Sequence, residues 1–247
     1  MTTLVLSGLV VFVTHSLEAV TGFGCSVLAM PFVSALLGVK TAVKVITILA
    51  WLLAVYIVIR NFSKIDWKQY TIITTLMLLG LPIGMYLFRS QQSGTLNLLL
   101  AVFIIVVSLT QLYRQARRTE KSSPPTGHKA LPYYLLLFLG GIIHGVFSSG
   151  GPLVVLYATR TLPDKGRFRA TLCLLWTTLN TIIIAGYLIE GSLTPPVAKT
   201  TLSLVPFLIA GIIAGEYIHD KVEARHFSLI VFSMLLATGI VMLLFAR

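Results

Sequence analysis

Two stretches of this chain combine glycine, serine and proline in a way that could bind an anion: "GFGCSVLAMP" at 22–31 and "FSSGGP" at 147–152. Glycine disfavours a helix interior and proline removes a backbone donor, so each stretch predicts that one helix ends and another begins. A helix that begins there presents unpaired backbone N–H groups and the positive end of its dipole. With serine hydroxyls beside it, such a terminus is suited to a negatively charged ligand.

Charged and titratable residues near these breaks indicate what else a site could use. Lys44 and Arg169 lie near the starts of apolar segments, where they could provide counter-charge for an oxyanion or extend to a membrane interface. Glu18 follows His15 by three residues, on the same helical face. Because an unpaired carboxylate is costly in hydrocarbon, this pair could carry a coupling proton or form a structural hydrogen bond. His144 lies in the corresponding segment of the second half, though not at the aligned position.

We therefore predict a substrate-binding site at the two breaks, with a candidate proton-coupling pair at His15 and Glu18. The alternative is that the glycine clusters only let helices approach closely. Two clusters at matching positions favour a site. We predict no catalytic residue, no metal and no cofactor. The substrate-binding candidates are Gly22, Gly24, Cys25, Ser26, Lys44, Ser148, Ser149, Gly150, Gly151 and Arg169.

The composition requires that these residues be positioned by membrane-spanning helices. Of the 247 residues, 56% are apolar and 11% are charged, which is not typical of water-soluble domains. The first apolar segment has no basic leader and no cleavage site, so we expect a retained helix. The fold class is an all-α polytopic membrane bundle of about 8–10 full or half-membrane helices. The apolar segments are 4–20, 23–38, 41–60, 68–88, 95–113, 133–147, 150–160, 169–189, 197–218 and 226–246.

The segments can be aligned as two copies of five. Gly24 aligns with Gly150, and a one-residue slip then aligns Lys44 with Arg169 and Trp51 with Trp176. Further along, "GLPIGMY" at 80–86 aligns with "GIIAGEY" at 211–217. We therefore predict an N-terminal repeat, a basic cytoplasmic linker and a C-terminal repeat, with bounds 1–113, 114–131 and 132–247.

The distribution of basic residues favours inverted repeats with both termini outside. In that topology the inside loops 60–68, 114–129, 160–167 and 219–226 hold thirteen Lys and Arg. The outside holds four, at Lys40, Arg89, Lys199 and Arg247. A parallel arrangement with four spans per half lowers the split to ten against seven, which agrees less well with the positive-inside rule.

The sequence lacks the motifs that several function classes require. The chain contains no HExxH, GxSxG, Walker or CxxC motif, so hydrolysis and ATP-driven transport are not indicated. The net charge of +11 comes mainly from basic residues in the predicted cytoplasmic loops, where the positive-inside rule accounts for them. We therefore expect no nucleic-acid partner. Cys25 and Cys173 lie in apolar segments, which argues against a disulfide.

The motifs resemble the sulfite exporter TauE/SafE family of membrane permeases. "GFGCSVLAMPF" and "GVFSSGGPLVVLY" are similar to the duplicated family motif, and the resemblance covers nearly the whole chain. It carries over to Gly22, Gly24 and Pro31 in the first motif and to Gly150, Gly151 and Pro152 in the second. The chain departs from the family's usual triple glycine, because Gly24 is followed by Cys25 and Ser26.

The resemblance implies secondary transport of a small anion, such as sulfite, sulfoacetate or another organosulfonate, across the bacterial inner membrane. Broken helices in a duplicated bundle imply alternating access to a site near the midplane. The expected partners are a small anion, the lipid bilayer and a candidate coupling proton. The alternatives are an anion channel and a membrane assembly subunit that transports nothing.

Overall fold

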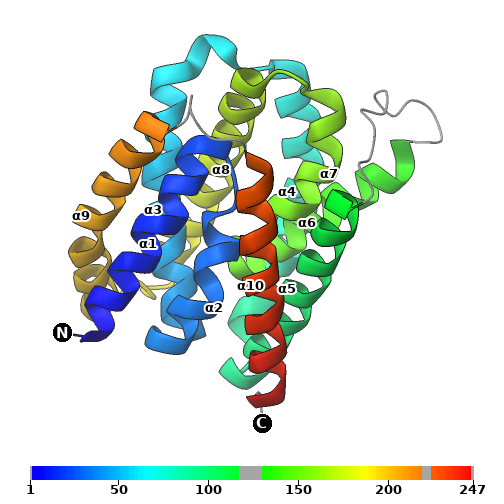
Figure 1. The fold of residues 1–247 in the computed structure, drawn as a ribbon. Helices are drawn as coiled ribbons and strands as arrows, with labels where there is room; N and C mark the ends of the chain where they lie inside the picture. The colour runs from blue at the N-terminus through cyan, green and yellow to red at the C-terminus, as the bar shows by residue number, and fades with distance from the viewer. Residues whose placement is uncertain (1, 117–129, 219–223, 246–247) are drawn as a thin grey trace.

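The computed structural model describes residues 2–116, 130–218 and 224–245, and these ranges form ten α-helices and no strand (Figure 1). The ten predicted segments and the all-α fold class are confirmed. Most of the predicted linker lies outside the described residues. The helices are α1 (Thr2–Thr21), α2 (Cys25–Leu37), α3 (Val39–Asn61), α4 (Trp67–Ser90), α5 (Ser93–Ala116), α6 (Leu131–Phe147), α7 (Gly151–Thr161), α8 (Lys165–Ile189), α9 (Pro195–Ile218) and α10 (Ala224–Phe245), with a 3-10 turn, η1 (Phe62–Lys64), before α4.

The protein is an integral membrane protein. Six of the described helices are long and apolar enough to cross a bilayer. Large apolar side chains, such as Leu9, Val106 and Ile213, are about half exposed or more on the outside of the bundle. Lipid accommodates such a surface, whereas a soluble monomer rarely exposes one that is this extensive.

Two helices, α2 and α7, are too short to cross the membrane. They contain 13 and 11 residues, which correspond to about 20 Å and about 17 Å of helix, against a hydrocarbon core about 30 Å thick. Each follows a break at a glycine-containing stretch, and Pro152 lies in the first turn of α7, where proline is tolerated. The predicted helix breaks are therefore confirmed.

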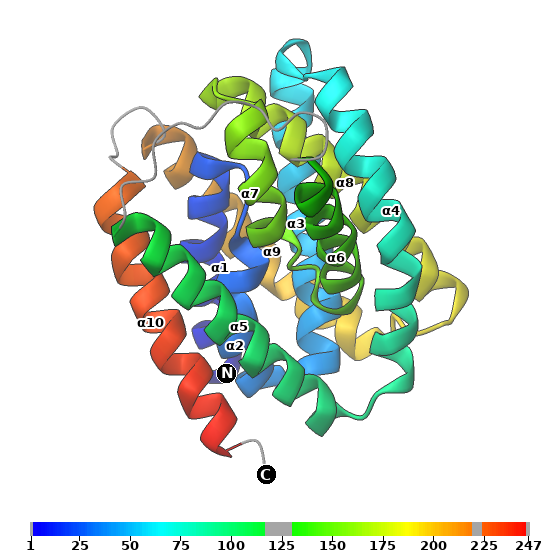
Figure 2. The same cartoon turned by 90° about the vertical axis from the view of Figure 1, so that its right-hand side faces the viewer.

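The two broken pairs approach the middle of the bundle from opposite ends. In Figures 1 and 2, α1 starts at the end marked N and α2 returns to that end, whereas α6 and α7 start from and return to the other end. The turns that carry basic residues at 60–68 and 160–167 lie at this second end (Figure 1). Inverted repeats would place the broken pairs in this way, and the repeat topology stays a prediction.

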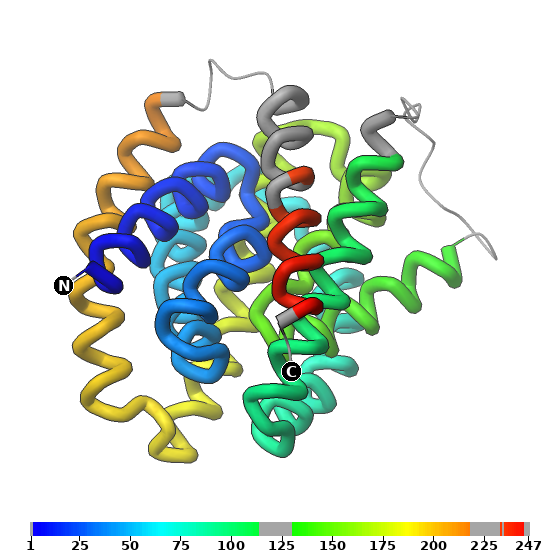
Figure 3. The backbone as a smooth tube through the Cα atoms, turned by 60° about the horizontal axis from the view of Figure 1, so that its bottom comes forward, coloured from blue at the N-terminus to red at the C-terminus, as the bar shows by residue number. Residues whose placement is uncertain are grey.

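The long helices pair across the two halves. The main contacts join α1 with α9, α4 with α6, α3 with α8 and α5 with α10 (Figure 3). At Gly84 of α4 an added Cβ would lie 2.8 Å from the Cα of Gly145 in α6, and at Gly215 of α9 it would lie 2.5 Å from the Cβ of Ala19 in α1. Both approaches are too close for any side chain. The aligned motifs at 80–86 and 211–217 thus have the same role, which is close packing on the first helix of the other half.

Candidate functional site

The two breaks border one small polar cavity. Glu18 and Ser26 line it from the first half, and Val27, Ala50 and Trp176 supply apolar surface. The second half contributes His144, Ser148, Ser149 and Asn180, while Gly24 and Gly151 bring backbone to the wall. The cavity has room for roughly one water molecule in this conformation. A ligand of several atoms therefore requires the two halves to move apart slightly.

In the first half, glycine geometry turns the chain from α1 into α2. Gly22 and Gly24 have φ angles of 83° and 107°, in the left-handed region that side chains disfavour. The Gly22 N–H donates to the Glu18 carbonyl at 2.7 Å and ends α1. The Glu18 carboxylate accepts the Cys25 N–H at 2.8 Å. A carboxyl group of the protein itself therefore already accepts a hydrogen bond at the N-terminus of α2.

In the second half, the same turn is built from other residues. Ser148 has a φ of 52°, and its N–H donates to the His144 carbonyl at 2.7 Å. His144 Nδ1 accepts the Gly150 N–H at 3.4 Å, and Nε2 lies 3.0 Å from Asn180 Oδ1. The neutral tautomer with a proton on Nε2 satisfies both ring nitrogens.

Glu18 and His144 therefore occupy equivalent positions. Gly24 and Gly150 are 126 positions apart in the chain, and so are Glu18 and His144, and Gly22 and Ser148. The expectation that His144 is not at an aligned position is wrong, because the comparison that matters is with Glu18 and not with the other histidine. Each of the two residues accepts a backbone N–H at the start of the short helix in its own half.

Each loop is held by a long helix of the other half. Trp176 of α8 donates its indole N–H to the Gly22 carbonyl at 3.0 Å, and Thr47 of α3 shares a hydrogen bond with the Ser148 hydroxyl. Trp176 also stacks on His144, with ring centroids 5.2 Å apart. These contacts connect the two breaks through α3 and α8.

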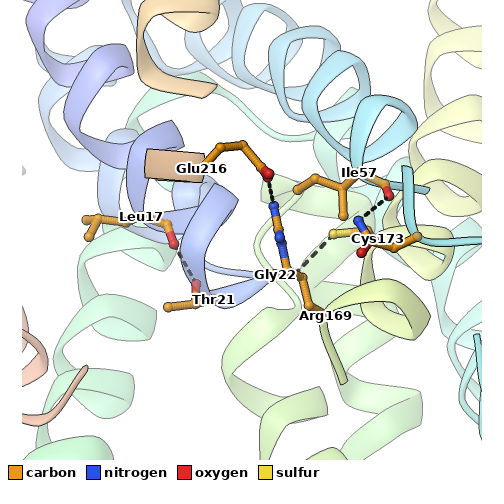
Figure 4. Close-up of polar contacts among 8 residues, drawn as sticks. Leu17, Thr21, Gly22, Ile57, Arg169, Cys173 and Glu216 are labelled. Atoms are coloured by element: carbon orange, nitrogen blue, oxygen red, sulfur yellow. Dashed lines mark hydrogen bonds and ion pairs between the residues drawn. The ribbon is translucent and has the colours of Figure 1, made fainter. Parts of the chain in front are cut away.

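The two predicted cations do not line the cavity. Arg169 is 5% exposed and forms an ion pair with Glu216 of α9 beside the α1–α2 loop (Figure 4). Arg169 is buried in this pair, whereas the Glu216 side chain is 32% exposed. Lys44 donates to the Ser192 carbonyl at 2.9 Å and lies 5.9 Å from the Tyr187 ring centroid. Cys25 and Cys173 are free, buried thiols, as expected.

His15 does not pair with Glu18. Its Nδ1 lies 3.0 Å from the Val11 carbonyl oxygen, and its Nε2 is buried with no hydrogen-bond partner among the described residues. The alternative of a structural bond between His15 and Glu18 is therefore wrong. Glu18 bonds the N–H of Cys25 instead.

A family model described as sulfite exporter TauE/SafE matches residues 7–242, which include both breaks and the cavity. The chain belongs to the TauE/SafE family. This membership makes the protein a membrane transporter of sulfur-containing anions and not an enzyme. No curated protein and no solved structure matched the chain.

Of the candidate residues in this TauE/SafE protein, Gly24, Ser26, Ser148, Ser149 and Gly151 line the cavity. Gly22, Cys25 and Gly150 shape the two loops behind it. Sequence reasoning missed Trp176 as a cavity residue, although it aligned that tryptophan with Trp51. It also missed Asn180, because α8 is apolar on several faces and its sequence does not reveal which face meets the cavity.

Proposed function

We propose that this protein is a secondary transporter that moves a small sulfur oxyanion or organosulfonate, such as sulfite or sulfoacetate, across the bacterial inner membrane by alternating access. The observation that carries the proposal is the meeting of α2 and α7 at one polar cavity, with each short helix starting there from an opposite direction. Half-helices that start at depth are the usual anion sites of duplicated transporters.

The cavity has the chemistry that an oxyanion needs. The first turns of α2 and α7 supply backbone donors, and the hydroxyls of Ser26, Ser148 and Ser149 can supply more. The oxygens of a sulfite or sulfonate group accept several hydrogen bonds from different directions. Val27 and Ala50 form an apolar wall against which the carbon chain of an organosulfonate would lie. The small cavity favours a small ligand.

The arrangement of the helices supports alternating access by two inverted repeats. The broken pairs enter from opposite ends, and the loops at Gly22 and Ser148 are each held by the other half. Rocking one half against the other would therefore open the cavity to one end while closing the other. The cavity argues against the non-transporting subunit, which predicts closely packed glycine clusters at the breaks.

Ligand binding tests the substrate assignment. We expect sulfite, thiosulfate or sulfoacetate to raise the melting temperature of the purified protein, because a ligand at 100 times its dissociation constant stabilises the folded state by about 2.7 kcal/mol. Acetate and chloride are the controls. Proteoliposomes preloaded with unlabelled anion should then take up labelled anion by saturable counterflow. A channel would show no counterflow stimulation, and the absence of any response to all three sulfur anions would contradict the proposal.

The roles of Lys44 and Arg169 remain proposals, in which they guide the anion on its way to or from the cavity. Arg169→Gln should lower flux at least tenfold, since a buried cation attracts an anion strongly. Arg169→Gln also leaves Glu216 without its partner, so the matched variant is the double substitution Arg169→Gln with Glu216→Gln. Recovery of flux in the double variant would show that the pair is structural. Lys44→Gln should lower flux in the same assay, and unchanged flux would remove Lys44 from the mechanism.

A further inference from the structure

Glu18 occupies the place that the proposed substrate needs. Its side chain lines the cavity, the residue is 3% exposed, and the carboxylate accepts the Cys25 N–H at 2.8 Å. That N–H belongs to the first turn of α2, which is one of the two backbone donor sets proposed for the anion. In this conformation a side chain of the protein therefore occupies the donor at that helix terminus.

Among the residues that the structure describes, none forms an ion pair that would neutralise an ionised Glu18. The titratable groups nearest to Glu18 are Cys25 of α2 and Cys173 of α8, and His144 of α6 lines the same cavity, whereas Arg169 and Glu216 lie near Cys173. Arg169 is paired with Glu216, and both nitrogens of the neutral His144 ring are bonded. Among the described residues, the hydrogen bond that Glu18 accepts comes from a neutral backbone group.

An ionised Glu18 and a bound anion therefore exclude each other. Two unit charges about 4 Å apart in an effective dielectric of about 20 repel strongly enough to weaken binding about a thousandfold. A protonated carboxyl group has the opposite effect, because its O–H is a donor that the anion can accept. His144, the equivalent residue in the second half, carries no charge in its neutral form, so the conflict exists in one half alone.

We propose that Glu18 is a proton-binding site of the transporter, and that its protonation lets the anion take its place at the N-terminus of α2, so that one proton moves with each anion. This inference rests on the proposed function. It selects Glu18 over His15, since His15 does not line the cavity and bonds to its own helix.

The test follows protons and anions together in proteoliposomes that contain a pH-sensitive dye. The probe is labelled sulfoacetate, because both of its acidic groups stay ionised between about pH 6 and 8. The wild type should acidify the lumen by one proton for each anion taken up. Glu18→Gln keeps the size and an acceptor oxygen but cannot ionise. We expect it to lose at least nine-tenths of the protons that the wild type moves for each labelled anion taken up.

Glu190→Gln is the matched control, because Glu190 lies at the end of α8 in a partly exposed pair with Arg89 and outside the cavity. It should keep both counterflow and proton movement. Proton movement in Glu18→Gln equal to the wild type would overturn the inference. So would wild-type sulfoacetate uptake without acidification, and in that case the proposed transport function would stand. No uptake of sulfoacetate, sulfite or thiosulfate by the wild type would refute both proposals.

If Glu18→Gln does not fold, the pH dependence of sulfoacetate binding by the wild type tests the inference instead. Linkage requires sulfoacetate binding to weaken tenfold for each pH unit above the range in which Glu18 holds its proton. An affinity that stays constant between about pH 6 and 8, with no proton taken up on binding by unbuffered protein, would overturn the inference.

Discussion

Gly22 and Ser148 hold the same left-handed backbone conformation in the two loops, although only one of them is a glycine. A side chain in this region costs about 1–2 kcal/mol. At Ser148 the hydroxyl bonds Thr47, which offsets part of that cost. At Gly22 no side chain fits, because an added Cβ would lie 2.8 Å from the Cα of Arg169. Both positions have a positive φ angle, but only position 148 has room for a side chain.

Gly22→Ala should therefore destabilise the protein by about 1–3 kcal/mol from backbone strain, and further through the collision with α8. The measurement is the melting temperature of the detergent-purified protein. Gly94→Ala is the control, since Gly94 lies in α5 with nothing within 4 Å of an added Cβ. Equal melting temperatures of the two variants would contradict the described loop.

Trp176 and Trp51 offer a matched pair at the same scale. Trp176 donates to the Gly22 carbonyl at 3.0 Å, and Trp51 donates to the Thr181 hydroxyl at 2.8 Å outside the cavity lining. Phenylalanine removes the donor and keeps an aromatic ring, at a cost of about 1 kcal/mol for one hydrogen bond. Trp176→Phe should weaken sulfoacetate binding about fivefold, and Trp51→Phe should not change it. Isothermal titration measures the sulfoacetate affinity of both variants. Equal effects would contradict a role of Trp176 in the site.

At the scale of elements, the first helix of each half depends on a glycine-rich face of the other half. Gly84 lets α4 approach α6, and Gly215 lets α9 approach α1. Lipid supplies little hydrophobic drive for helix association, so close packing of this kind supplies much of the stability. A side chain at either position must push two helices apart.

Gly84→Leu and Gly215→Leu should each lower the free energy of unfolding by about 1–3 kcal/mol or more, as overpacked side chains do. The comparison is with Gly94→Leu, which places the same side chain in open space. Unfolding in a denaturing detergent series measures the three variants. If all three unfold alike, the helix pairs are not packed as described.

At the scale of the whole molecule, the basic turns lie at one end of the bundle. The start of α1 and the last described turn of α10 lie at the other end (Figure 1). The positive-inside rule predicts that the basic end is cytoplasmic. Ser63 lies at the basic end and Ser93 lies at the opposite end, and both are exposed.

Single cysteines at these positions test the orientation, after Cys25 and Cys173 are replaced by serine. Ser63→Cys should react with a membrane-impermeant maleimide only in inverted vesicles, and Ser93→Cys only in intact cells. The reverse pattern would contradict the predicted orientation. Reaction of both positions from one side would contradict the bundle itself.

Much of this organisation could be predicted from the chain, and the exceptions have physical causes. The apolar runs predict the ten helices, and the glycines at 22 and 24 predict a break because helix interiors disfavour them. The equivalence of Glu18 and His144 was present as a constant separation in the chain, but the two side chains differ in type and charge. A comparison by residue type therefore does not reveal that equivalence.

Other features depend on tertiary contacts that no local pattern contains. Arg169 could equally have reached an interface, a ligand or a carboxylate, and only the tertiary fold brings Glu216 of α9 to it. Asn180 and Trp176 lie on a helix whose exposed and cavity-facing sides are both largely apolar. Rotation of that helix about its axis decides which residues meet the cavity, and the hydropathy pattern does not encode that rotation.

The unlike residues at positions 18 and 144 have a consequence for direction. If the halves exchange roles as the transporter turns from one side of the membrane to the other, a carboxylate and an imidazole exchange surroundings. The inward-facing and outward-facing forms then cannot have equal energy, and their balance must vary with acidity. Such a carrier would bind its substrate with unequal affinities on its two sides even when no gradient is applied.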